Sequence, residues 1–404
     1  MPHMRVRTQS TRASTLTAAL RIVHYIDHVD FRRGGPARAV VDQVRVMHGR
    51  GHDAAIATMT SIDVPAAWRL GEPGMPRSIQ VANAGGRIIT AAGIKALDAA
   101  VATADIVHLH GVWEPSNLQV AALARKRGAR TVVSLRGMLD DWCMAQGGFK
   151  KRIYLALGGR KMLERAAVVH CTAQAELEQS RKWFPRGRGM VVPNLMDMEP
   201  FRSLPGPAEA RTRFGIDPAG PPVVLFLSRL SHKKGVEHLI EATALLASRG
   251  VFIRTIIAGD GDEEYAARMR ALAGEACAPG RIDFVGHVGG PLKLSLLQAA
   301  TVFALPTSQE NFGFAFFEAL AAGLPVVTTD LVDTKAEIAA SGAGEIVPQR
   351  ADAFADAIER LLSDRSALAE RGRRGREWAL RELDTDAVAG QFEELYRSAL
   401  SASA

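Results

Sequence analysis

One stretch, residues 302–330 (VFALPTSQENFGFAFFEALAAGLPVVTTD), constrains the fold more than any other part of the chain. It opens with an apolar run at 302–305 that is too short for a helix and ends at a proline, which predicts a buried parallel strand. A polar loop follows, and a helix is expected from about Gly313 until Gly323 ends it. The β-branched run at 326–329 predicts the next strand. This order is one crossover unit of a parallel sheet, which indicates an α/β protein.

The loop of this unit carries the chemistry. It lies at the carboxyl end of a strand, where open α/β sheets bind ligands. The helix start behind it offers free N–H groups and a positive dipole, which suit a phosphate. Glu310 lies in the loop and Glu318 lies in the second turn of the helix. A carboxylate is a poor phosphate ligand, so we expect both Glu310 and Glu318 to accept hydrogen bonds from hydroxyls, such as a sugar and a ribose would offer.

Glu310 and Glu318 are separated by seven residues, with Pro-Thr-Ser before them and Ala-Ala-Gly-Leu-Pro-Val-Val after them. This segment resembles the E-x7-E segment of retaining glycosyltransferases of family 4. The resemblance implies the GT-B fold, in which two Rossmann-like domains face each other across a cleft. It also implies a nucleoside-diphosphate sugar as the donor. The residues between the glutamates that we assign to the donor site with them are Asn311, Phe312, Gly313 and Phe314.

Length and composition agree with a two-domain enzyme. The chain has 404 residues, 47% of them hydrophobic and 23% charged, which is enough for full cores and roughly two to three domains. No apolar run approaches the roughly 20 residues that span a bilayer. The three cysteines lie far apart, without metal-ligand spacing, which predicts a reducing cytoplasm.

Charge is divided unevenly along the chain. Residues 1–200 hold 28 Lys and Arg against 16 Asp and Glu, a net of +12, and residues 201–404 carry a net of −5. The first half is therefore expected to meet something anionic. Nucleic acid is disfavoured, since no recognisable nucleic-acid module is present. An anionic membrane surface at the inner membrane face, or a lipid-phosphate acceptor, fits better. Ordinary solvated charge stays open as the alternative.

Strand–helix units repeat on both sides of a Pro- and Gly-rich link at about 195–222. We therefore expect a flexible basic leader at 1–20, an N-terminal acceptor-binding Rossmann-like domain at 21–195, a C-terminal nucleotide-sugar-binding Rossmann-like domain at 196–384, and a C-terminal helix at 385–404 that crosses back to the first domain.

Three places in the first domain are candidate site positions. Gly34 and Gly35 follow the first strand, where glycine allows backbone to approach a phosphate; a tight connecting turn is the alternative. His110 ends the strand predicted at 106–110 and precedes Gly-Val-Trp. The resemblance implies that Gly34 and Gly35 touch the donor, that His110 contacts the transferred sugar, and that Trp113 faces the acceptor.

The run Arg136-Gly137-Met138-Leu139, followed by a basic cluster at 150–152, resembles a subset of family 4 that builds bacterial surface polysaccharides. Arg136 is expected to hold either an acceptor phosphate or a carboxylate, and the residues leave both open. The cluster at 150–152 is either a solvated face or a membrane contact.

The second domain offers cations at a strand end. Ser228 and Arg229 follow the strand predicted at 223–227, and Lys234 precedes the next helix. Arg229 and Lys234 are predicted to clamp a diphosphate, whereas Lys233 is expected to face solvent. In similar enzymes the loop after the strand at 282–285 holds the base through backbone groups, which assigns Gly286, His287 and Val288 to the donor site.

Cations, a helix dipole and carboxylates suit a reaction whose leaving group is a nucleoside diphosphate. We predict a hexosyltransferase that needs no metal and no cofactor, with Glu310, His110, Arg229 and Lys234 as its catalytic group. The acceptor is expected to be a glycan or a lipid-phosphate-linked sugar. Asp260-Gly261-Asp262 matches a metal motif of another transferase fold, and we interpret the match as chance. A sugar-nucleotide binder without turnover, an epimerase-like enzyme and an inverting transferase remain alternatives.

Overall fold

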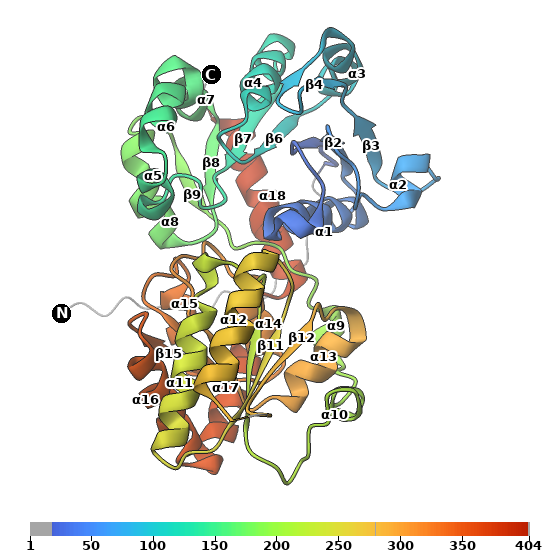
Figure 1. Cartoon of the computed structure of the whole chain (residues 1–404). Helices are drawn as coiled ribbons and strands as arrows, with labels where there is room; N and C mark the ends of the chain where they lie inside the picture. The colour runs from blue at the N-terminus through green and yellow to red at the C-terminus, as the bar shows by residue number, and fades with distance from the viewer. Residues whose placement is uncertain (1–17, 279, 403–404) are drawn as a thin grey trace, which may run out of the picture.

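Two separate parallel sheets, each packed against helices, form the two lobes of the molecule (Figure 1). The computed structural model describes residues 18–278 and 280–402. The first sheet has seven strands in the order β3-β2-β1-β6-β7-β8-β9, and the second has six in the order β12-β11-β10-β13-β14-β15. The expected α/β architecture with two Rossmann-like domains is confirmed.

The strands of the first sheet are β1 (Arg21–Tyr25), β2 (Asp53–Thr58), β3 (Arg77–Gln80), β6 (Ile106–His110), β7 (Arg130–Ser134), β8 (Val168–Cys171) and β9 (Gly189–Val191). Those of the second are β10 (Val223–Leu227), β11 (Arg254–Ala258), β12 (Ile282–Gly286), β13 (Val302–Leu305), β14 (Val326–Thr329) and β15 (Gly344–Val347). A separate antiparallel pair joins β4 (Asn83–Ala84) to β5 (Ile88–Ile89).

The α-helices of the first half are α1 (Gly35–Gly49), α2 (Ala66–Leu70), α3 (Ala91–Val101), α4 (Pro115–Arg127), α5 (Asp141–Ala145), α6 (Gly148–Tyr154), α7 (Arg160–Arg165), α8 (Gln174–Ser180) and α9 (Glu199–Arg202). Those of the second are α10 (Ala208–Phe214), α11 (Val236–Ser248), α12 (Glu263–Ala276), α13 (Gly290–Ala299), α14 (Phe314–Ala321), α15 (Lys335–Ala340), α16 (Ala351–Leu362), α17 (Arg365–Glu382) and α18 (Thr385–Ser401). Short turns are η1 (Phe31–Arg33), η2 (Leu155–Gly159), η3 (Arg181–Trp183) and η4 (His232–Lys234).

Strand order fixes where a ligand can bind. In the first sheet the chain proceeds outward from β1 through β2 and β3, and then restarts on its other side at β6. The second sheet does the same from β10, with β13 on its other side. Loops that leave neighbouring strands in opposite directions open a crevice at the carboxyl ends of those strands. The crevices therefore lie at the ends of β1 and β6 in one domain and of β10 and β13 in the other.

The last helix packs against the first domain, although α17 before it packs against the second. Phe392 and Tyr396 of α18 are buried in one apolar cluster with Ile22 of β1 and Val168 of β8. Figure 1 shows α18 beside β7 and β8 in the upper lobe. The chain thus passes between the lobes twice, once after β9 and once before α18.

Several segments differ from expectation. The charged segment at 208–214 forms helix α10, whose apolar side packs on the second core through Ala210. The β4–β5 hairpin and helix α5 were not predicted. Most of the predicted leader, residues 1–17, lies outside the described residues. Within the described ranges, no helix combines the length and apolar character needed to cross a bilayer.

Candidate active site

A lysine and a glutamate form the centre of the second domain's side of the site. Lys234 ends η4, and Glu310 lies in the loop after β13. Their side chains form an ion pair, with 7% and 20% of their surfaces exposed. Burial alone would raise the pKa of Glu310, but the charges of Lys234, Lys233 and Arg229 outweigh it and hold that pKa below its ordinary value. Glu310 is therefore an anion held among cations.

Gly235 brings the lysine loop against the end of β13. Its φ of 61° lies in the left-handed region, and a Cβ atom there would lie 2.2 Å from the carbonyl oxygen of Pro306. Only glycine allows η4 to pack so closely that Lys234 reaches Glu310. Lys233, which was predicted to face solvent, is half-buried instead: its Nζ lies 5.1 Å from the ring centroid of Trp142 in the first domain.

Helix α14 carries the second glutamate. Its N-cap is Gly313, and its first turn, with the N–H groups that lack partners within the helix, begins at Phe314. Glu318 accepts a hydrogen bond from Nζ of Lys293 at 2.6 Å, so its carboxylate is held by a cation from α13. Lys293 had no signal in the sequence, because only tertiary packing brings α13 beside α14.

The glycine-rich loop of the first domain lies directly against these elements. A Cβ atom on Gly34 would lie 3.4 Å from Nη2 of Arg229, and one on Gly35 would lie 3.2 Å from the ring of Phe314. Gly34 also has a φ of 125°, which side chains rarely adopt. The loop after β1 and the diphosphate-clamp candidate after β10 therefore meet across the cleft.

Polar contacts on one side of the cleft join the domains. Asp333 accepts hydrogen bonds from Nε2 of Gln179 in the first domain at 2.8 Å and from Nδ2 of Asn311 at 3.1 Å. Asn311 in turn accepts one from Oγ1 of Thr172, again in the first domain, at 3.0 Å. Burial, reinforced by the charge of Glu176, raises the pKa of Asp333 to about 7. Sequence patterns gave no sign of this acid.

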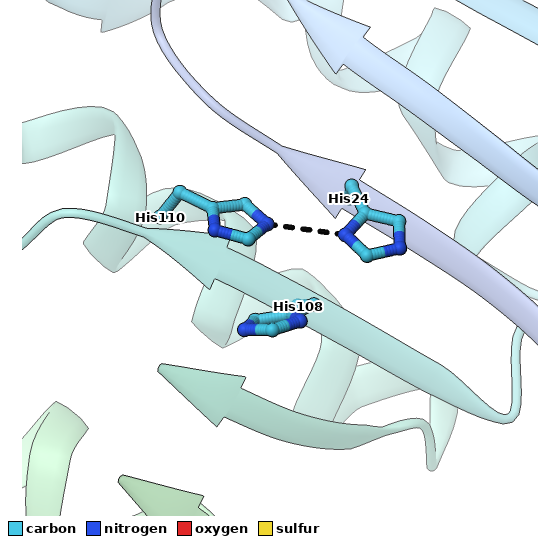
Figure 2. Close-up of side chains that lie close together, drawn as sticks. All are labelled: His24, His108 and His110. Carbon is cyan, nitrogen blue, oxygen red and sulfur yellow. Dashed lines mark hydrogen bonds between the residues drawn. The ribbon is translucent and has the colours of Figure 1, made fainter. Parts of the chain in front are cut away.

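His110 lies in a buried group of three histidines. Figure 2 shows His24 on β1 beside His108 and His110 on β6, and Nδ1 of His24 lies 3.1 Å from Nε2 of His110. Burial lowers the pKa of His24 to about 3, and it lowers the pKa of the other two well below the ordinary value. All three imidazoles are therefore neutral at physiological pH.

Arg136 determines which nitrogen carries the proton in His110 and in His24. Its Nη2 donates to Nδ1 of His110 at 3.0 Å, and because arginine can only donate, Nδ1 must accept. The proton of neutral His110 is then on Nε2 and is donated to Nδ1 of His24. Nε2 of His24 carries that ring's proton and has no partner among residues 18–278 and 280–402. Both nitrogens of His110 are therefore engaged in hydrogen bonds within the protein.

Arg136 itself is buried, and its φ of 57° is a left-handed conformation. It donates a second hydrogen bond from Nη1 to Asn194, at the start of the link between the domains. Burial lowers its pKa to about 10, which still leaves it charged. In this conformation its guanidinium faces His110 and the side-chain amide of Asn194. The sequence had left open an acceptor phosphate or a carboxylate as the partner of Arg136.

The C-terminal helix completes this network. Nδ1 of His108 lies 2.9 Å from the hydroxyl of Tyr396, and its Nε2 lies 2.7 Å from Oγ of Ser134. Nε2 of Gln43 donates to the same tyrosine hydroxyl at 2.9 Å. Helix α18 is thereby bonded to β6 two residues before His110.

Two family comparisons cover most of the chain. Residues 34–195 match the family described as "Glycosyl transferase 4-like domain", and residues 210–378 match "Glycosyl transferases group 1". D-inositol 3-phosphate glycosyltransferase of Corynebacterium urealyticum is 30% identical over 313 residues, which make up 73% of this chain and 71% of that protein.

The chain belongs to glycosyltransferase family 4.

Other members match over shorter regions. 2-Deoxystreptamine glucosyltransferase of Streptomyces kanamyceticus is 32% identical over 206 residues, so the chain spans about half the length of that relative, 52%. Sucrose-phosphate synthase of Thermosynechococcus elongatus superposes with a TM-score of 0.77 at 22% identity, over 95% of this chain and 100% of that one. That likeness shows the fold, and the expected GT-B architecture is confirmed.

The remaining donor-site and acceptor-site candidates of this family 4 chain differ in burial and in their contacts. The N–H of Ser228 donates to the carbonyl of Ala258 at 3.1 Å. Gly286 and His287 are exposed at the end of β12, Val288 is buried next to them, and Phe312 is buried against Phe314 and Phe317. The indole of Trp113 donates to the carbonyl of Met138 at 3.1 Å.

Two groups of potential metal ligands have other structural roles. Asp262 caps α12 by accepting from the N–H of Tyr265 at 2.8 Å. One ring nitrogen from each of His24, His108 and His110 lies within 4.8 Å of the other two, close enough to share an ion. Every ring nitrogen of the three except Nε2 of His24 is engaged in a hydrogen bond, however, and the guanidinium of Arg136 lies beside them as a cation. We therefore interpret the three histidines as a hydrogen-bonded network.

Proposed function

We propose that this family 4 protein is a metal-independent retaining hexosyltransferase, which moves a hexose from a nucleoside-diphosphate sugar to a glycan or lipid-linked acceptor in surface polysaccharide synthesis. The observation that carries the proposal is the Lys234–Glu310 pair, with Arg229 beside it and Gly34 opposite. The cations Lys234 and Arg229 and the carboxylate of Glu310 thus lie at one crevice, with the glycine backbone at Gly34 facing them.

Each group then has a role as the sugar–phosphate bond breaks. Negative charge accumulates on the departing diphosphate, and Arg229, Lys234 and the first turn of α14 stabilise it. Glu310 orients sugar hydroxyls, and its negative charge favours the oxocarbenium-like sugar. Glu318 binds the ribose. The leaving diphosphate accepts the acceptor proton, so the acceptor attacks from the same face and the anomeric configuration is retained. Contact between the domains excludes water, which limits hydrolysis of the donor.

The acceptor is proposed to be presented at a membrane. The surplus of positive charge lies in the first half of the chain, and Phe149 is highly exposed next to the basic residues Lys150, Lys151 and Arg152. An exposed aromatic ring beside cations suits an anionic lipid surface. We accordingly propose a cytoplasmic protein that contacts the inner membrane face peripherally.

The first test is thermal stabilisation of the pure protein by UDP-, GDP- and ADP-sugars, with and without EDTA. Stabilisation by one base family that EDTA leaves unchanged supports the proposal and names the donor. Stabilisation that EDTA abolishes overturns metal independence. Binding without donor hydrolysis or transfer indicates a non-catalytic sugar-nucleotide binder, and an inverted anomeric centre in the product overturns retention.

A further inference from the structure

An apolar stripe lies exposed on the outer flank of the first domain. Phe149, Ile153 and Leu157 have 79%, 43% and 81% of their surfaces exposed. They are spaced four residues apart along α6 and η2, which places them on one face of a nearly continuous helix. Figure 1 shows α6 and α7 on the side of this domain opposite α2 and α3. Large apolar side chains in a row on a surface indicate an interaction site.

Cations border this stripe. Lys150 and Arg152 lie on α6, and Arg160, Lys161 and Arg165 lie on α7. Within residues 18–278 and 280–402, none of these five side chains forms an ion pair. On α17, by contrast, Arg373 and Arg374 both pair with glutamates of their own helix. The positive charges of these five side chains are therefore available to bind an anionic partner.

A hollow of about 850 Å³ opens between these cations, and its polar wall consists of Arg152, Arg160, Lys161, Glu164, Arg165 and Arg186. Arg186 donates to the Glu164 carboxylate at 2.6 Å, which neutralises the acid of this wall. Four cations remain without a counter-charge. The π-helical turn η2 carries Leu157 of the stripe, directly precedes Arg160 of α7, and contributes Leu155 and Ala156 to the lining of this hollow. Such turns are frequent at functional sites.

We propose that this hollow binds the phosphate headgroup of an anionic membrane lipid while Phe149, Ile153 and Leu157 enter the lipid boundary. The cations alone would suit any polyanion. The adjoining apolar stripe favours an anionic lipid surface, because only a membrane offers hydrocarbon next to its phosphates. The inference rests on the membrane contact of the proposed function and adds to it a defined headgroup site. The site is separate from the donor crevice, so its loss should leave donor binding intact.

The experiment measures sedimentation of the full chain with vesicles of phosphatidylcholine alone, or of equal parts phosphatidylcholine and phosphatidylglycerol. Each cation near an anionic surface contributes roughly fivefold in affinity. Arg160→Gln with Lys161→Gln should therefore lower binding to the anionic vesicles about 25-fold. The matched control, Arg69→Gln with Lys95→Gln, removes the same charge from α2 and α3 and should change binding far less.

The apolar stripe is tested by Phe149→Ser with Leu157→Ser, which should weaken binding to both kinds of vesicle. Leu70→Ser with Ile88→Ser is its control, because those side chains are also exposed but lie on the other flank. Inorganic diphosphate should release the wild-type protein from anionic vesicles more than chloride of equal ionic strength. All variants should keep the donor-induced stabilisation of the wild type.

The outcomes separate the claims. Equal loss in the Arg160/Lys161 pair and in its control would show that only net charge matters, which overturns the headgroup site. Unchanged binding of the Arg160/Lys161 pair would overturn the site and leave the membrane contact standing. Failure of the wild type to bind either vesicle would overturn the membrane contact as well, whereas the transferase proposal depends on the donor experiment alone.

Discussion

Replacing Lys234 with alanine tests the centre of the proposed site. The change removes the cation that pairs with Glu310 and that we propose stabilises the departing diphosphate. Loss of one such electrostatic contact lowers turnover about 10²- to 10³-fold in other enzymes. We expect Lys234→Ala to do the same, which corresponds to roughly 2.7–4 kcal/mol of transition-state stabilisation.

The same change leaves Glu310 with an unbalanced charge. Breaking a fully buried pair costs about 3–5 kcal/mol of folding stability. Because 20% of the Glu310 side chain is exposed and Lys233 and Arg229 remain nearby, we expect a smaller loss of about 1–3 kcal/mol. The pKa of Glu310 should rise, since burial then opposes fewer positive charges.

Steady-state kinetics with the donor found in the thermal screen, together with thermal denaturation, separate the two effects. Lys234→Met combined with Glu310→Gln removes both charges, so it should recover stability while turnover stays low. Lys335→Ala, an exposed lysine of the same domain, is the charge-matched control. Near-wild-type turnover in a folded Lys234→Ala protein would refute the assignment of Lys234 to the diphosphate.

Three further changes test other parts of the site. Glu318→Ala should weaken donor binding roughly 10- to 100-fold, as expected for a hydrogen bond to a charged group, with a smaller change in turnover; a change in turnover alone would contradict the ribose role. The pKa of Asp333 is about 7 in the folded protein, above the ordinary value of 3.8, so the folded state binds the extra proton and stability should fall as pH rises from about 4 to 7. Asp333→Asn should flatten that slope, which is at most about 1.4 kcal/mol per pH unit, in denaturation curves; an unchanged slope would exclude this acid as its source. Gly34→Ala should lower turnover more than Gly86→Ala, because both glycines have positive φ but only Gly34 faces Arg229; equal effects would indicate backbone strain alone.

The sequence by itself determined the repeating strand–helix units and the family. Apolar runs such as 302–305 and 223–227 are the strands β13 and β10 as predicted, because a strand buried on both faces must be apolar throughout. The glutamate spacing around α14 and the residues that flank it are a local pattern, and their resemblance to glycosyltransferases of family 4 needs no knowledge of contacts.

Tertiary structure alone decided which side chains meet. Lys293 reaches Glu318 from another helix, Asp333 joins the two domains, and Tyr396 bonds to His108 across 288 positions of sequence. The periodicity of the sequence does not predict such pairs, since they depend on how helices and domains pack. Packing also determined that both nitrogens of His110 are engaged, because burial and a neighbouring guanidinium, rather than the residue type, set the protonation of a histidine.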